Sequence, residues 1–285
     1  MASAMKASQI DLSKVTFSAP KTLDNGGKML FLNYNGGINP LYITLPEVEV
    51  PFDPMYFDDN ENSGKYTVKI SMKDLETNKE LEALHSKISE MDELLKNKAA
   101  ENSGTWFKKP KLSMDVINEL YTPMIKVSTD PETGEPNGKW PDSFGFKIVK
   151  KDGVFPRFSI YDNNKVVFDV DRKTDNPVDL ENVLMKGTLI KAVLKCNGVW
   201  IANGKFGCTW RAEQVRAKVP EGGLREFAIE SDSDEEDEVI DEKPVMIEDS
   251  DEEEEEEEVK EPEPEPEPKK KVRKLKVKKK SSDGE

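Results

Sequence analysis

Histidine and cysteine are almost absent from this chain of 285 residues, which has one histidine, His85, and two cysteines, Cys196 and Cys208. A structural zinc site takes four nitrogen or sulfur ligands, more than these residues could supply, so we expect no metal and no cofactor. We expect the two cysteines to be reduced core thiols of an intracellular protein. His85 lies among polar residues of a helical pattern, and we expect it to face solvent.

Sequence motifs of catalysis are also absent. The segment Asn25-Gly26-Gly27-Lys28 lacks the five residues (Gly-x-x-x-x) that precede Gly-Lys in a P-loop and the Ser/Thr that follows the lysine. Neither Gly-x-Ser-x-Gly nor His-Glu-x-x-His occurs in the sequence. The carboxylate pairs Asp58-Asp59 and Asp169/Asp171 could hold Mg²⁺ in principle, but such pairs arise by chance in so acidic a chain. The sequence therefore predicts a protein that is not an enzyme.

Long apolar runs are missing as well. The first residues, Met-Ala-Ser-Ala-Met-Lys, contain no apolar core of a signal peptide, and no stretch approaches the length that spans a bilayer. We expect an intracellular protein that has no membrane contact.

Charge, in contrast, is abundant and unevenly placed. The net charge is −15, yet residues 1–229 carry 32 acidic against 31 basic residues. Residues 230–268 carry 23 acidic against 2 basic residues, and residues 269–285 carry 2 against 9. A near-neutral body joined to a polyanion is typical of proteins that deal with nucleic acid or with the proteins that bind it.

This distribution predicts three regions. Residues 1–228 are long enough for one folded domain with a hydrophobic core. Residues 229–268 form an acidic tail, which we expect to be disordered because it has too little apolar surface to offset the entropy of ordering. Residues 269–285 form a basic terminus.

Two functions are open for the terminal regions. The basic cluster is typical of a nuclear-import signal, which would place the protein in the nucleus of a eukaryotic host. It could instead contact phosphates or fold back on the acid. Its residues are Lys269, Lys270, Lys271, Arg273 and Lys274. Ser231, Ser233 and Ser250 precede acidic residues and suit an acidophilic kinase, or remain unmodified.

Residue periodicity in the body predicts a mainly β domain with one helix. Strands are expected at 15–17, 28–34, 41–45, 65–72, 124–128, 144–150, 156–161, 164–170 and, after 187, in a final meander with turns at Asn197-Gly198 and Asn203-Gly204. A short helix is expected near 113–120. In segment 65–72, Tyr66, Val68, Ile70 and Met72 alternate with polar residues, which is typical of a half-buried strand.

The long helix is expected over about 74–99, where apolar residues recur every three or four positions: Leu81, Leu84, Ile88, Met91 and Leu95. The stripe could pack on the body or form a coiled-coil dimer. No internal repeat and no β-α-β alternation is present. The pattern fits an elaborated oligonucleotide-binding (OB) fold, a Greek-key barrel, with one inserted helix.

Aromatic residues interleave with basic ones, as binding of single-stranded DNA requires, because flat rings stack on bases and cations follow the backbone. Each aromatic could instead belong to the core. Trp106 is the first choice among the candidates, because it lies beside lysines at the edge of a segment. The candidate DNA-binding residues are Trp106, Phe107, Lys108, Lys109, Lys111, Trp140, Lys147, Arg157, Tyr161, Trp200, Lys205, Trp210 and Arg211.

Three segments carry a resemblance to a known family: Gly104-Thr105-Trp106-Phe107-Lys108, the stretch 158–161, and 200–215, which runs from Trp-Ile-Ala-Asn-Gly to Gln-Val. Over roughly residues 10–220 the chain resembles the single-stranded-DNA-binding proteins of nucleocytoplasmic large DNA viruses of algae, relatives of the short-tailed-coliphage protein. The resemblance implies an OB barrel, cooperative coating of single strands in viral replication and recombination, and an acidic tail that competes with DNA. It also implies a place in a viral replication compartment, if not in the nucleus.

The resemblance also implies partners: replication proteins (polymerase, helicase or primase) that dock on the acidic tail, and a possible homodimer. Phage members end the tail in an aromatic residue, whereas this sequence ends Ser-Ser-Asp-Gly-Glu after its basic block. We therefore do not expect the phage mode of dimerisation and polymerase docking to carry over. The rival interpretation is a nuclear histone-chaperone-like protein whose acidic tail binds basic proteins directly.

Overall fold

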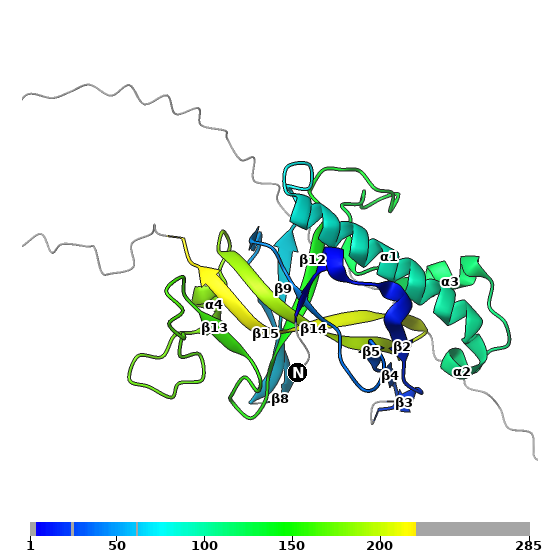
Figure 1. Ribbon diagram of the computed structural model, residues 1–285, viewed down its shortest axis with the longest axis horizontal. Coiled ribbons are helices and arrows are strands. Elements are labelled where there is room, and N and C mark those ends of the chain that lie inside the picture. Colours follow the sequence, from blue (N-terminus) through cyan, green and yellow to red (C-terminus); the bar gives the residue numbers. More distant parts are fainter. Residues whose placement is uncertain (1–3, 24–25, 61, 221–285) are drawn as a thin grey trace, which may run out of the picture. The chain divides into compact units, whose positions relative to one another are not determined.

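The described part of the chain is mainly β. In the computed structural model, residues 4–23, 26–60 and 62–220 are described, and all of them belong to one compact unit (Figure 1). Its longer strands are β8 (Met55–Asn60), β9 (Ser63–Ser71), β12 (Ser143–Lys150), β14 (Leu189–Ala202) and β15 (Lys205–Lys218). Its short strands are β1 (Met5–Lys6), β2 (Val15–Phe17), β3 (Lys21–Thr22), β4 (Lys28–Leu30), β5 (Leu32–Tyr34), β6 (Tyr42–Thr44), β7 (Val48–Glu49), β10 (Tyr121–Thr122), β11 (Ile125–Lys126) and β13 (Ser159–Tyr161).

One large mixed sheet organises these strands. Its main path is β1-β6-β14-β15-β12-β9-β8, with further short strands attached to it, while β2 and β5 pair separately. β15 pairs antiparallel with β14 along one edge. Along its other edge it pairs parallel with three segments in turn, β10, β12 and β13. A single strand therefore joins parts of the chain that lie far apart in sequence.

The expected Asn-Gly turns have different outcomes. Asn203 and Gly204 have positive φ values of 50° and 71° and join β14 to β15, which confirms a tight hairpin there. At Asn197-Gly198 the expected turn is wrong, because β14 continues through it with a shift of register between Cys196 and Gly198. Gly198 is required at this bulge: its φ is 106°, and a Cβ there would lie 2.0 Å from the carbonyl oxygen of Leu30 on β4.

The expected strand at 164–170 is also wrong. Lys165 has a positive φ of 65°, and the Val166 amide donates to Asp162 Oδ1 at 2.8 Å, so residues 162–166 form a turn. Only an isolated bridge between Tyr161 and Val167 follows it. The turn-forming residues 162–165 (Asp-Asn-Asn-Lys) therefore determine the conformation of this segment, and the apolar residues that follow them do not form a strand.

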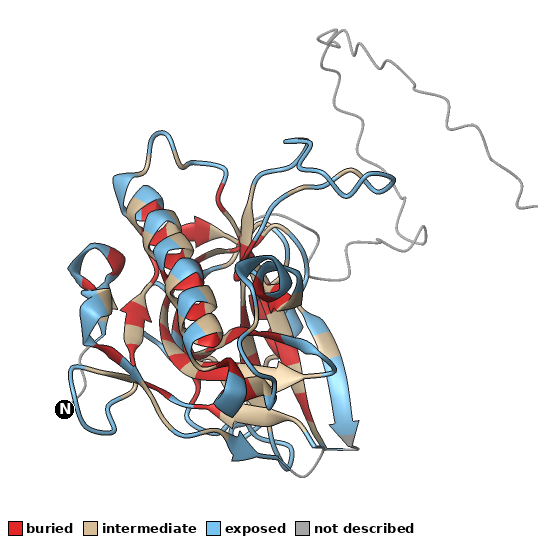
Figure 2. Ribbon diagram, turned by 90° about the vertical axis from the view of Figure 1, so that its right-hand side faces the viewer, coloured by how far each residue is buried: buried red, intermediate tan, exposed pale blue. Residues whose placement is uncertain are grey.

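The expected helix is α1 (Lys79–Glu101), and its apolar stripe packs on the body. The helix begins later than expected because Asn78 caps it, accepting from the amides of Glu80 and Leu81. All five stripe residues are buried, and buried and exposed residues alternate along the helix in Figure 2. Against the coiled-coil alternative, the stripe belongs to the same core as the sheet.

Shorter helices flank the sheet. They are α2 (Ser103–Phe107), α3 (Met114–Leu120), α4 (Leu180–Val183) and the 3₁₀ turns Ala7–Gln9 and Leu12–Lys14. α3 confirms the short helix expected near 113–120. Ser113 caps it by accepting from the Val116 amide.

Candidate nucleic-acid interface

A row of side chains crosses five strands of the sheet. Thr67 pairs with Lys147, Lys147 with Arg211, Arg211 with Lys195, and Lys195 with Tyr42. Residues that pair directly across strands point to the same side of a sheet. Their neighbours in sequence, including Phe146, Ile148, Trp210 and Leu194, are buried in the core. The alternation of β9, β12, β14 and β15 therefore places cationic residues on the side away from the core.

We call this side the open face and define it by six cationic residues: Lys65, Lys69, Lys126, Lys147, Lys195 and Arg211. Lys126 is exposed and the other five are half-buried. Lys69 and Lys65 lie on β9 opposite Gly145 and Val149 of β12, on either side of the row. Six positive charges thus share one side of neighbouring strands.

Few carboxylates neutralise the open face. Asp59 pairs with Lys65 at 3.0 Å, and Glu213 pairs with Arg211 at 2.7 Å. No described carboxylate forms an ion pair with Lys69, Lys126, Lys147 or Lys195. The buried Nε of Arg211 also has no acceptor in the described part of the chain. A polyanion would supply acceptors to these groups.

The pKa values of three lysines of the open face are lowered, and desolvation is the main cause. Partial removal from water lowers the pKa of Lys147, and the neighbouring Lys65 lowers it further. Desolvation lowers the pKa of Lys126, the carboxylate of Asp92 opposes this shift, and Lys69 adds to it. The pKa of Lys195 is lowered by desolvation and then by Arg211. The folded protein therefore holds these ammonium groups in an environment that penalises their charge, and phosphate groups would relieve the penalty.

Aromatic and apolar side chains frame the cations. Tyr42 stands at one end of the row, where Lys195 Nζ lies 6.0 Å from its ring centroid. At the other end, Met55 and Phe57 of β8 pair with Thr67 and Lys65, and both are exposed. Flat and apolar surfaces therefore flank the charged row on both sides, as stacking of bases requires.

A hollow of about 260 Å³ opens on the same face, beside Trp200. Trp200 pairs with Gly207, where a Cβ would lie only 3.1 Å from its Cζ2 atom, so the absence of a side chain lets the ring lie there. Three cations of the open face, Lys69, Lys126 and Lys147, line the hollow.

The structure brings together part of the predicted set. Lys147 and Arg211 lie in the row, and Trp200 lines the hollow. Arg157 is exposed and shares a second hollow with Tyr42, beyond the Lys195 end of the row. Tyr161 is half-buried on β13, pairs with Arg216 and lines neither hollow.

Two predicted stacking residues need correction. Trp106 is only 4% exposed and Trp210 only 1%, so neither ring is open to a base in this structure. Trp106 packs edge-on against Phe17, and Trp210 against Phe144, while its indole N–H donates to Met124 Sδ at 3.1 Å. Both are core residues because their strand or helix turns them inward.

Other candidates lie near Trp106, and Lys28, which was not predicted, shares a hollow with Trp106, Phe107, Lys108 and Lys109. We call this second basic region the hairpin-tip region and define it as Lys28, Trp106, Phe107, Lys108, Lys109, Lys111 and Lys205. Phe107 is half-buried, and its ring packs edge-on against Phe206. Lys205 Nζ donates to the Glu119 carbonyl oxygen at 2.5 Å, and Lys28 Nζ to that of Trp106 at 2.6 Å. Lys108, Lys109 and Lys111 are exposed. Trp140 is 66% exposed in a loop outside both regions, with Lys139 Nζ 5.7 Å from its ring.

Sequence reasoning missed four cations of the open face, Lys65, Lys69, Lys126 and Lys195, and the ring of Tyr42. The alternation of apolar and polar residues over 65–72 placed Lys65 and Lys69 on the polar side of the predicted strand. Nothing local indicated that these residues would join Lys147 and Arg211, because the pairing depends on strands about 80 and 140 residues away in sequence.

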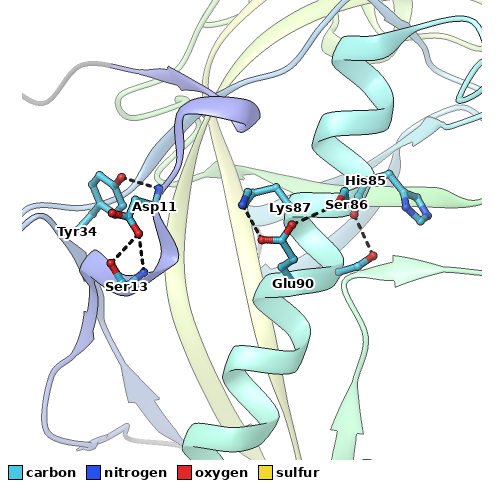
Figure 3. A network of polar contacts seen from close by, with 8 residues as sticks. Asp11, Ser13, Tyr34, His85, Ser86, Lys87 and Glu90 are labelled. Carbon is cyan, nitrogen blue, oxygen red and sulfur yellow. Dashed lines mark hydrogen bonds and ion pairs between the residues drawn. The ribbon is translucent and has the colours of Figure 1, made fainter.

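His85 departs from expectation. Its side chain is half-buried, and its Nε2 lies 3.0 Å from Asp142 Oδ2. In Figure 3, Ser86 Oγ donates to Glu90 at 3.3 Å. The hydroxyl of Ser89 donates to the His85 carbonyl oxygen at 2.9 Å. In the same view Asp11 accepts from Ser13, and Tyr34 accepts from the Asp11 amide. These hydrogen bonds stabilise the local structure of α1 and of the segment around Asp11.

The remaining polar candidates have local partners. Asp169 accepts from the amides of Lys173 and Thr174, Asp171 from that of Phe155, and Asp59 pairs with Lys65. Cys196 and Cys208 are buried free thiols with their sulfurs 3.4 Å apart. No cluster of three or more potential metal ligands occurs among the described residues.

The candidates at 229–285 lie outside the described residues: the acidic region, Ser231, Ser233, Ser250 and the basic cluster at 269–274. No described helix is both long and apolar enough to cross a membrane.

Comparison with known proteins gives weak likenesses only. No protein-family model matches the chain, and no curated protein sequence matches it. The single-stranded DNA-binding protein from bacteriophage Enc34, solved in complex with ssDNA, is similar with a TM-score of 0.39 and 11% identity, covering 72% of this chain and 96% of that one. Gp2.5, a single-stranded DNA-binding protein of bacteriophage T7, has a TM-score of 0.38 and 14% identity, covering 67% and 98%. At these values the likeness assigns no family.

Proposed function

We propose that this protein is a non-enzymatic, sequence-independent single-stranded-DNA-binding protein and that the open face is its DNA-binding surface. The observation that carries the proposal is the row Lys147–Arg211–Lys195 with Lys65, Lys69 and Lys126 around it, four of the six without a described ion-pair partner. Cations in this arrangement recognise a chain of phosphates without reading its sequence.

Single strands are favoured over duplex because of the rings beside the cations. Tyr42, Phe57 and Trp200 offer flat surfaces that only unpaired bases can reach, and each stacked base contributes about 1–3 kcal/mol. The competing function, a histone-chaperone-like protein, would use acidic surfaces to bind basic proteins. A cationic face on the body has no role in that function.

We further propose that the body is an elaborated OB fold and that the protein acts in viral DNA replication or recombination, in the nucleus or a viral replication compartment. In this proposal the acidic residues of 229–268 compete with DNA and dock replication proteins, and the cluster at 269–274 serves import. The support is compositional, since residues 230–268 carry 23 acidic residues against 2 basic ones. A tethered polyanion would compete at high effective concentration.

The test is fluorescence anisotropy with labelled oligo-dT and a matched duplex over a salt series, for the full chain and for a truncation after Phe227. We expect tight oligo-dT binding, weak duplex binding, and tighter binding by the truncated chain. Lys147→Gln should weaken oligo-dT binding, while Lys98→Gln is the matched control, because Lys98 pairs with Glu101 on α1. Absence of oligo-dT binding by both forms would refute the proposal, and histones would be the next ligand to test.

A further inference from the structure

The hollow beside Trp200 has the dimensions and walls of a site for one flat ring. Its volume of about 260 Å³ lies below the roughly 300–1,000 Å³ of pockets for drug-sized ligands. Trp200 of β14 forms one wall, and Thr122, Pro123 and Met124 form another. Gly145 and Thr209 contribute from β12 and β15.

Both walls are held in place by contacts on the core side. Met124 is fixed twice: its amide donates to Asp92 Oδ2 at 3.3 Å, and its sulfur accepts from Trp210 Nε1 at 3.1 Å. Asp92, a buried residue of α1, also accepts from the hydroxyl of Tyr121. Trp200 is held in the sheet by pairing with Met29 and Gly207. A hollow with fixed walls is preorganised for a ligand.

The chemistry of the lining selects a neutral ring attached to an anion. Three lysines, Lys69, Lys126 and Lys147, line the hollow, and its lining contains no carboxylate. Four hydroxyl groups could hydrogen-bond the edge of a ring, those of Thr67, Thr122, Ser143 and Thr209. Trp200, Pro123 and Met124 offer apolar surface for its faces.

We propose that this hollow binds a single nucleobase of the bound strand against Trp200, with the adjoining phosphates on Lys69, Lys126 and Lys147. The inference rests on the proposed function and makes it specific: the row of cations holds the backbone, and one base leaves the stack of its neighbours to enter the hollow. Affinity then depends on a base at one position as well as on the number of phosphates.

The test separates bases from phosphates. Binding of labelled dT₁₂ and of an abasic strand with the same backbone is measured by anisotropy, at one salt concentration, with the full chain. Trp200→Ala removes one wall. Gly145→Val fills the hollow from β12, where an added Cβ would have only an ordinary 3.7 Å contact with the Val68 carbonyl oxygen. Trp140→Ala is the matched control, because this exposed tryptophan lies outside the hollow.

For the wild type we expect dT₁₂ to bind about tenfold or more tightly than the abasic strand. In Trp200→Ala and Gly145→Val the ratio should fall severalfold while abasic binding is kept, and Trp200→Phe should restore most of it. Trp140→Ala should leave the ratio unchanged. An unchanged ratio in folded Trp200→Ala and Gly145→Val would overturn the base site but leave the proposed function intact. If neither strand bound to the wild type, the proposed function itself would fail.

Discussion

The two basic regions differ in what their ammonium groups face. In the hairpin-tip region, Lys28 and Lys205 donate to carbonyl oxygens in the last turns of α2 and α3. In the open face, Lys69, Lys126, Lys147 and Lys195 have no described carboxylate partner, and the pKa values of the last three are lowered. The carbonyl contacts of Lys28 and Lys205 contribute to the fold, whereas desolvation of the charged Lys147 and Lys195 reduces its stability and leaves them available for an anionic ligand.

The largest difference between the regions should appear in DNA affinity. Replacing Lys147, Lys195 and Arg211 together by Gln removes three phosphate contacts, which should lower the salt slope of log K by about 2 and the oligo-dT affinity by about 100-fold at 0.1 M salt. The matched control replaces Lys108, Lys109 and Lys111 by Gln, removing the same charge, and should cost only a few-fold. Equal losses, measured by anisotropy over a salt series, would abolish the distinction between the regions.

Stability should change in opposite directions at one lysine of each region. Lys205→Met removes the hydrogen bond to the Glu119 carbonyl oxygen and should lower the free energy of unfolding by about 1 kcal/mol. Lys147→Met removes a half-buried charge without an ion-pair partner and should leave stability unchanged or raise it by up to about 1 kcal/mol. Urea unfolding at neutral pH measures both. A loss of similar size in the two variants would contradict the comparison.

The gain from Lys147→Met should depend on pH. Because the pKa of Lys147 is lowered in the folded state, the unfolded chain binds more protons between that value and about 10.4, so the penalty decreases as pH rises through this window. The stability difference between Lys147→Met and the wild type should be greatest near pH 7 and shrink towards pH 10. A difference that stays constant over this range, by urea unfolding, would mean that charge is not its cause.

The smallest effect is expected at Trp140, which belongs to neither region. The ring is 66% exposed, so Trp140→Ala should change the free energy of unfolding by less than about 0.5 kcal/mol. Oligo-dT affinity should stay within about threefold of the wild type. A larger loss of affinity, with stability unchanged, would extend the DNA-binding surface to the loop that carries Trp140.

Local patterns in the sequence predicted individual elements well. The alternation of 65–72 and the stripe of α1 are confirmed residue by residue, and so is the Asn203-Gly204 turn. The second Asn-Gly pair failed as a turn because the close approach of Leu30, about 170 residues earlier, makes Gly198 part of a bulge. Whether a Trp in a basic segment faces solvent depends likewise on distant packing, as at Trp106.

The site was predicted only in part for the same reason. Lys147, Arg211 and Trp200 lie within ring-and-cation clusters that the sequence displays. Lys195 has no such neighbourhood in the chain, and it joins the row only through the register of β14 with β15 and β6. A surface assembled by pairing across strands has no local signature in the sequence.

The pairing of β15 also sets the order in which this protein can fold. β10, β12 and β13 all find their partner on one edge of β15, and β14 finds its partner on the other. Since β15 follows all of them in the chain, these pairings can form only after residues 205–218 have been made, although β12 can already pair with β9, and β14 with β4, β6 and β7. Pairing of β15 with β10, β12 and β13 closes long loops of the chain, and the closing of long loops slows folding. We therefore expect this sheet to be completed only after its last strand, β15, has been made.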